Sequence, residues 1–207
     1  VEIVPQRDEQ GQPLDLSLLA KGVVANAEGV VTGQGRIVWS PDGEVTSTGQ
    51  FSSESIDFAA AFGPVRGASG TIEFTDLLGL TTAPGQTLRV ASVNPGIEVA
   101  GGEVGFELRN GEVLAVTGGS WPFMGGELIL RAVDLNLGVS EERRYIFEIV
   151  GLDAGTFVTE MDLENISATG LFDGAVPIVF DANGNGRIDT GVLISRPPGG
   201  TVSYVGE

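Results

Sequence analysis

The side chains whose spacing best suits chemistry lie in one polar run, DANGNGRID, over positions 181–189. Oxygen-bearing side chains stand at its first, third, fifth and ninth positions: Asp181, Asn183, Asn185 and Asp189. Calcium is held in proteins by about six to eight oxygens that converge within a short loop, and EF-hand loops place them at this spacing. The twelfth position, where an EF-hand carries a bidentate Glu, is Val192.

Two interpretations of this loop stay open. The first is a calcium-stabilised β surface or adhesion-like binding module. The second is a hairpin turn between two strands, because Asn and Gly readily adopt positive φ. The flanking runs VPIVF and GVLIS are typical of strands, whereas an EF-hand needs helices there. We therefore favour the hairpin and predict no metal or other cofactor.

The residue inventory argues against an enzyme. The chain has no His, no Cys and a single Lys, Lys21, so the usual general base, the thiol nucleophile and the commonest zinc ligands are missing. Acidic neighbours such as Glu141 and Glu142 are expected by chance among 28 acidic residues. Serines such as Ser195 have no His to activate them. We predict that the chain is not an enzyme.

The net charge and the hydropathy of the chain limit the kinds of molecule that it can bind. The formal net charge is -17 and the isoelectric point is about 4.1, so a nucleic-acid backbone would be repelled. No run approaches the ~18 apolar residues of a membrane-spanning helix. The chain starts at Val1 without Met. We expect a processed or trimmed fragment, with any anchor in the missing N-terminal part.

The secondary structure that positions these side chains is predicted to be almost entirely β-strand. Thirty-two glycines separate short apolar runs that alternate with polar residues, as in a many-turned β protein. We predict one β-rich domain over 1–207, with 1–13 frayed. Two helices are expected, one over 14–27 and a short one over 153–161 that Asp153 caps.

Strand pairing is predicted to be local, giving a long, curved, mostly antiparallel meander. Asp42-Gly43 and Asn110-Gly111 are hairpin turn signals between alternating runs. The run over 127–139 is expected to be one long strand, and its apolar parity changes between Leu130 and Val133, which indicates a bulge or bend. Apolar residues also alternate at Ile56/Phe58 and Ile72/Phe74.

The apolar faces of these strands are the predicted functional surface. The aromatic cluster WPFMGG over 121–126 lies at a strand junction and is consistent with core packing or with the lining of a groove. Ten side chains are the candidates for the lining of such a groove or of a closed core: Phe106, Leu108, Trp121, Phe123, Leu128, Leu130, Tyr145, Phe147, Ile178 and Phe180.

The order of motifs resembles a known family. The runs IEFTDLLGLTTAPGQTLRV, WPFMGGELIL and VGLDAGTF, followed by the stretch from Ala168 to Tyr204, are similar to the C-terminal part of YdbH-like proteins. These belong with the AsmA-like group of bacterial envelope proteins and carry an old "dicarboxylate transport" domain label. The likeness covers roughly residues 29–207. That label suits the chain poorly, since Arg and Lys total only 11.

The resemblance implies a fold and a function. Such proteins are anchored in the inner membrane, cross the periplasm of Gram-negative bacteria, and form a U-shaped or taco-like sheet with an apolar inner groove. Phospholipid acyl chains move along the groove, and a small outer-membrane lipoprotein joins the C-terminal end by strand addition. No catalytic residues are implied. A third possibility is a structural cap that closes the groove and docks the lipoprotein.

Overall fold

The computed structural model describes residues 24–60, 63–94, 97–182 and 185–204. Strands dominate, with one short helix. In chain order the elements are β1 (Val24–Gly29), β2 (Thr32–Trp39), β3 (Val45–Ala60), β4 (Gly63–Asp76), β5 (Thr81–Thr82), β6 (Gln86–Val93), β7 (Val99–Arg109), β8 (Val113–Phe123), β9 (Gly126–Leu130), β10 (Val133–Asn136), β11 (Arg143–Asp153), α2 (Ala154–Glu160), β12 (Ile166–Ala168), β13 (Leu171–Phe180), β14 (Gly186–Ile188), β15 (Val192–Ser195) and β16 (Val202–Tyr204).

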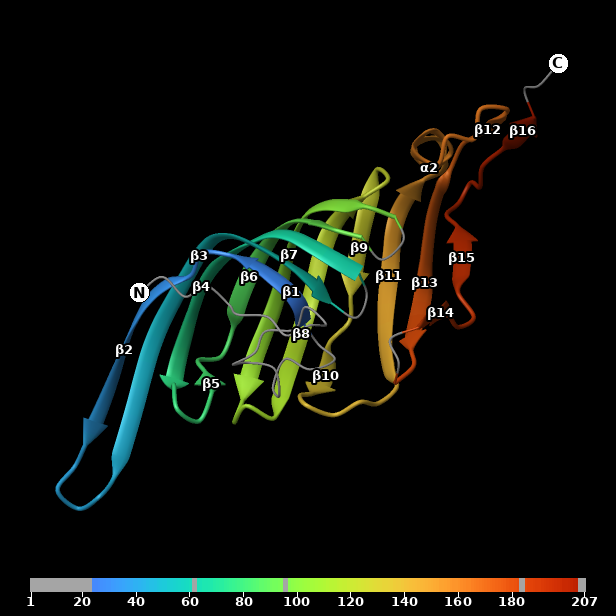
Figure 1. The fold of residues 1–207 in the computed structure, drawn as a ribbon. Helices are drawn as coiled ribbons and strands as arrows, with labels where there is room; N and C mark the ends of the chain where they lie inside the picture. The colour runs from blue at the N-terminus through green and yellow to red at the C-terminus, as the bar shows by residue number, and fades with distance from the viewer. Residues whose placement is uncertain (1–23, 61–62, 95–96, 183–184, 205–207) are drawn as a thin grey trace.

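Fourteen strands form one antiparallel sheet that is not closed into a barrel. The main path runs β1-β3-β4-β6-β7-β8-β9-β11-β13-β14, so neighbours in the chain are mostly neighbours in the sheet, and the predicted meander is confirmed. Strands β12 and β16 form a separate pair beside α2 at the C-terminal end (Figure 1). The long axis of the sheet therefore follows the sequence.

Turn chemistry sets the register of the central hairpin. Asn110 and Gly111 join β7 to β8 with φ of 51° and 64°, the two positive values that a type I′ turn requires. The register Leu108↔Leu114 then places apolar residues of both strands on one face. The predicted hairpin signals at Asp42-Gly43, between β2 and β3, and at Asn110-Gly111 are thus confirmed.

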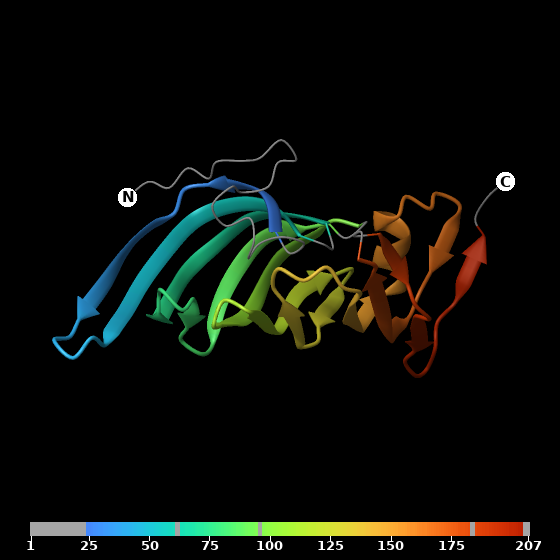
Figure 2. The same cartoon turned by 60° about the horizontal axis from the view of Figure 1, so that its bottom comes forward.

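Irregular pairing accompanies a strong bend of the sheet. The β3–β4 register shifts between Ser53 and Ile56, and the β7–β8 register shifts between Gly105 and Phe106. Such irregularities increase local twist and bend the strand that carries them. Figure 2 shows the result, with β3, β4, β6 and β7 curved into an arch.

The predicted helix over 153–161 is confirmed as α2. Asp153 is its N-cap, and its side chain accepts a hydrogen bond of 2.7 Å from the Thr156 N–H. This N–H has no partner within the helix, so the carboxylate satisfies it. These hydrogen bonds from Thr156 hold the pKa of Asp153 below its usual value.

Other predictions need correction. Residues 24–27 of the predicted helix over 14–27 are in β1, because Val24 and Ala25 pair with β3. The rest of that helix and the lead-in over 1–13 lie outside the described residues. The run over 127–139 is two strands, β9 and β10, interrupted at residues 131–132, where a bulge or bend was predicted; β10 continues along β8 in the register of β9.

We predict that Gly111→Ala destabilises the protein by about 1 kcal/mol, because an L side chain at positive φ is sterically strained. Urea unfolding should show a lower midpoint with an unchanged slope. Gly191→Ala is the matched control, since no positive φ is recorded there and a Cβ would make only ordinary contacts. Equal midpoints for the two variants would contradict the turn assignment.

Candidate functional site: an apolar groove under the sheet

A cavity of about 380 Å³ lies on one face of the sheet, within the range of small-molecule pockets. Its walls come from β3, β4, β6, β7, β8, β9, β10 and β11, together with Ala27 and Val31. The largest contributors are Phe51, Ile56, Phe58, Val65, Ile72, Leu88, Val90, Val93, Val104, Phe106, Leu114, Val116, Trp121, Leu128, Leu130, Leu135, Tyr145 and Phe147. We call this cavity and its walls the groove.

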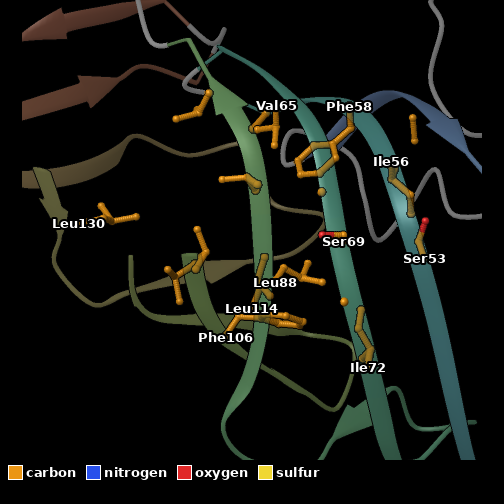
Figure 3. A pocket seen from close by; sticks show the side chains of 18 of the residues that line it. Ser53, Ile56, Phe58, Val65, Ser69, Ile72, Leu88, Phe106, Leu114 and Leu130 are labelled. Atoms are coloured by element: carbon orange, nitrogen blue, oxygen red, sulfur yellow. The ribbon is translucent and has the colours of Figure 1, made fainter. Parts of the chain in front are cut away.

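The groove runs across the strands and not along them. Register places its side chains on one face, as in the opposed pairs Leu88↔Val104 and Trp121↔Leu128. In Figure 3, Leu130 lies across the opening from Ile56 and Phe58. The path β3-β4-β6-β7-β8-β9-β11 contains six strand spacings of about 4.8 Å, so the sheet that forms the wall of the groove measures about 29 Å along this path.

The lining carries no charged side chain among the described residues. Its polar members are the serines Ser52, Ser53 and Ser69. Ser53 donates a hydrogen bond of 2.7 Å to the carbonyl oxygen of Val30, and Ser52 Oγ lies 2.9 Å from Thr71 Oγ1. Protein partners therefore occupy two of the three hydroxyls. The walls offer a ligand apolar contact and little hydrogen bonding.

An aromatic pair stands at each end of the groove. At the β3–β4 end, the rings of Phe51 and Phe74 meet edge to face with centroids 5.9 Å apart. At the β11–β13 end, Tyr145 and Phe180 meet in the same way at 5.7 Å. Tyr145 is only 2% exposed, and its burial raises the pKa of the hydroxyl, an effect that Arg143 opposes. The uncharged ring thus stays part of the apolar wall at neutral pH.

The opposite face of the sheet carries a set of ion pairs. They link different strands, and one of them joins Arg131, directly after β9, to Glu148 of β11. Others are Arg89–Glu103, Arg109–Asp134 and Arg144–Asp189. These pairs are exposed and individually worth little, about 0–1 kcal/mol. The charged side chains keep the outer face of the sheet hydrated, and the face that lines the groove carries no charge along the groove in the described part of the chain.

The ten predicted lining residues all lie on the apolar face. Six line the groove: Phe106, Trp121, Leu128, Leu130, Tyr145 and Phe147. The other four lie beyond it. Leu108 is opposite Leu114, Phe123 follows Trp121 on the same face, Ile178 is opposite Tyr145 and Phe180 is opposite Arg143.

The cavity extends further towards the N-terminus than the candidate residues do. Its walls begin at Ala27 of β1, and β3 and β4 contribute Phe51, Ile56, Phe58, Val65 and Ile72, which were not among the candidates. The alternation at Ile56/Phe58 and Ile72 was a usable signal. This alternation was not sufficient, because it does not show which strands, distant in the sequence, line the same cavity.

The polar run over 181–189 contains β14, which pairs antiparallel with β13 as in a hairpin, with Phe180 opposite Gly186. Asp181 accepts hydrogen bonds from Asn185, and Asp189 accepts one of 2.8 Å from Arg144. Asn183 lies outside the described residues. Within the described part of the chain, no three acidic side chains converge as a metal site would need. Calcium binding by this loop stays an untested alternative to the favoured hairpin.

Comparison with known proteins assigns the family. The sequence model described as "YdbH-like: Intermembrane phospholipid transport protein YdbH" matches residues 4–207, nearly the whole chain. The chain belongs to the YdbH-like family. Neither the curated proteins nor the solved structures contain a significant match. The resemblance noted in the sequence is confirmed.

Membership of the YdbH-like family bears on activity and location. Its description is that of an intermembrane phospholipid transport protein, which is not an enzyme family and points to the cell envelope. None of the described helical segments has the length and hydropathy to cross a bilayer. In this YdbH-like chain, the uncharged groove is the feature whose chemistry fits a lipid.

A pair of leucines tests whether the groove is open. Leu152 is 5% exposed and packed in the core, and Leu88 lines the groove and is half-buried. We expect Leu152→Ala to lower the free energy of unfolding by about 3 kcal/mol, because it leaves an enclosed void. Leu88→Ala should cost only about 1 kcal/mol, since that side chain is not fully desolvated. Denaturant unfolding measures both, and equal losses would indicate a closed core.

Proposed function

We propose that this chain is a periplasmic segment of an intermembrane phospholipid transport protein and that the groove holds acyl chains on their way between the inner and outer membranes. The observation that carries the proposal is the uncharged lining, which continues across seven neighbouring strands. In the same proposal, an inner-membrane anchor lies outside these 207 residues. The family description supports the envelope location.

The dimensions of the groove suit acyl chains. A bilayer's hydrocarbon core is about 30 Å thick and holds two leaflets, so one acyl chain reaches about 15 Å. The wall of the groove, about 29 Å along the sheet, therefore exceeds the length of one chain. Each buried methylene contributes about 0.8 kcal/mol, so ten of them give about 8 kcal/mol without any polar contact. That is enough to offset much of the cost of association.

Charge indicates where the headgroup stays. A phosphate or ammonium group inside the groove would lose its hydration and find no charged partner, which is strongly unfavourable. The headgroup therefore remains in water at the open side while the acyl chains occupy the groove. Such binding recognises chain hydrophobicity more than headgroup identity.

The two tryptophans provide a direct test of lipid occupancy. Trp121 lines the groove and is 3% exposed, whereas Trp39 is 70% exposed on β2. In Trp39→Phe, we expect phosphatidylcholine vesicles with brominated acyl chains to quench the remaining indole fluorescence, and unbrominated vesicles to leave it unchanged. The matched control is Trp121→Phe, which retains only Trp39. Equal quenching in both variants, or none in Trp39→Phe, would contradict the proposal.

A second part of the proposal concerns a partner at the C-terminal edge. Within the described residues, β15 pairs with β13 alone, and its other edge has no neighbouring strand. Val192, Leu193 and Ile194 are each more than half exposed, so apolar side chains project from both faces of this strand. We propose that a small outer-membrane lipoprotein adds a strand here, because free edges with apolar side chains invite pairing.

An ion pair steadies this edge. Arg196 donates hydrogen bonds of 2.7 and 2.6 Å to the Asp173 carboxylate, which also accepts the Gly151 N–H at 2.8 Å. These interactions lower the pKa of Asp173, with Arg196 the main cause. The carboxylate is therefore charged at neutral pH, and β15 is held against β13 while its outer edge remains available.

A proline substitution tests strand addition. Arg196 N donates to Leu171 O, so along β15 the Ile194 N–H also faces β13 and the Leu193 N–H faces outward. Leu193→Pro should abolish co-purification of a lipoprotein with the detergent-solubilised protein while leaving the β13 pairing intact. Leu193→Ala retains the N–H and should retain the partner. Retention by both variants would sink the proposal for this edge.

A further inference from the structure

The indole of Trp121 lies over two glycines near the middle of the row of strands that lines the groove. Gly119 precedes it by two residues on β8, and the register Glu103↔Ser120 continues to place Gly102 of β7 opposite Trp121. A Cβ on Gly102 would overlap Cδ1 and Nε1 of the indole, and a Cβ on Gly119 would come within 2.5 Å of Cη2. The ring therefore covers both glycines.

Backbone conformation does not explain these glycines. Gly102 and Gly119 have no φ in the positive range, so their backbone would accept other residues. The space that the ring occupies is what excludes a side chain. A larger residue at either position would push the indole away from the sheet and into the groove. The two glycines thus keep the widest side chain of the lining close to the sheet.

Tryptophan is also an unusual choice for stability alone. Its Nε1 is buried, and it finds no hydrogen-bond acceptor within the described part of the protein. A buried polar group without a partner costs about 1–3 kcal/mol, which Leu or Phe at this position would avoid. The neighbouring side chains Val104, Leu128 and Leu130 are all aliphatic. Stability therefore does not explain why residue 121 is Trp, whereas a role for the width of the indole ring does.

We propose that Trp121, resting on Gly102 and Gly119, sets the free depth of the groove at its centre and so selects slender linear acyl chains over chains that carry bulky groups. This inference rests on the proposed lipid-binding function. Raising the indole narrows the passage, and removing it widens the passage. The selectivity is steric, because no charged group takes part in the lining here.

Re-isolation of the protein from vesicles tests the first consequence. The protein is incubated with dioleoyl phosphatidylethanolamine and dioleoyl phosphatidylglycerol vesicles, and bound lipid per chain is measured by mass spectrometry. We expect Gly102→Ala to weaken binding about fourfold for each methylene that loses its contact. Gly102→Ala combined with Trp121→Leu should restore binding, and Gly191→Ala should leave it unchanged. Unaltered binding in folded Gly102→Ala would overturn the inference.

A bulky lipid tests the second consequence and does not depend on the folding of Gly102→Ala. Trp121→Leu should bind phosphatidylcholine with a pyrene-labelled acyl chain better than the wild-type protein does, with linear-chain binding preserved. Equal preference for the two lipids in both proteins would overturn the inference and leave the proposed function standing. A wild-type protein that binds neither lipid would overturn the proposed function, and the inference with it.

Discussion

The sheet separates apolar from charged side chains by face, bends, and stops short of closing. If the sheet closed into a small barrel, its apolar side chains would pack against one another and fill the interior. Here the strands arch but the sheet does not close, and a cavity remains on its apolar face. The groove depends on this incomplete closure.

The features that depend only on residues close together in the chain were predicted correctly from the sequence. The turn at Asn110-Gly111 and the cap at Asp153 rest on local backbone chemistry, and both are present in the structure. The shared face of the ten candidate residues follows from alternation within each strand. Residues 24–27 were misassigned because Val and Ala are compatible with either state, and pairing with β3 decides for a strand.

The site itself was only partly predictable, for two physical reasons. Irregularities such as the one between Ser53 and Ile56 change strand parity, so counting residues from Phe51 does not give the facing of Phe58. The bend also determines which strands meet across the groove, and it depends on the whole sheet. Glycines illustrate the same limit: the sequence pattern associated them with turns between short apolar runs, yet Gly102 and Gly119 lie within strands beneath the Trp121 ring.

The direction of the groove makes its reach a matter of counting. An apolar path that runs across antiparallel strands lengthens by about 4.8 Å for each strand added, or by roughly 10 Å for each hairpin. In a sheet with this strand order, adding or removing one hairpin changes the length of the apolar path and leaves the width of the groove the same. Under the proposed function, the reach of the apolar path would be set by the number of units such as the hairpin of β7 with β8.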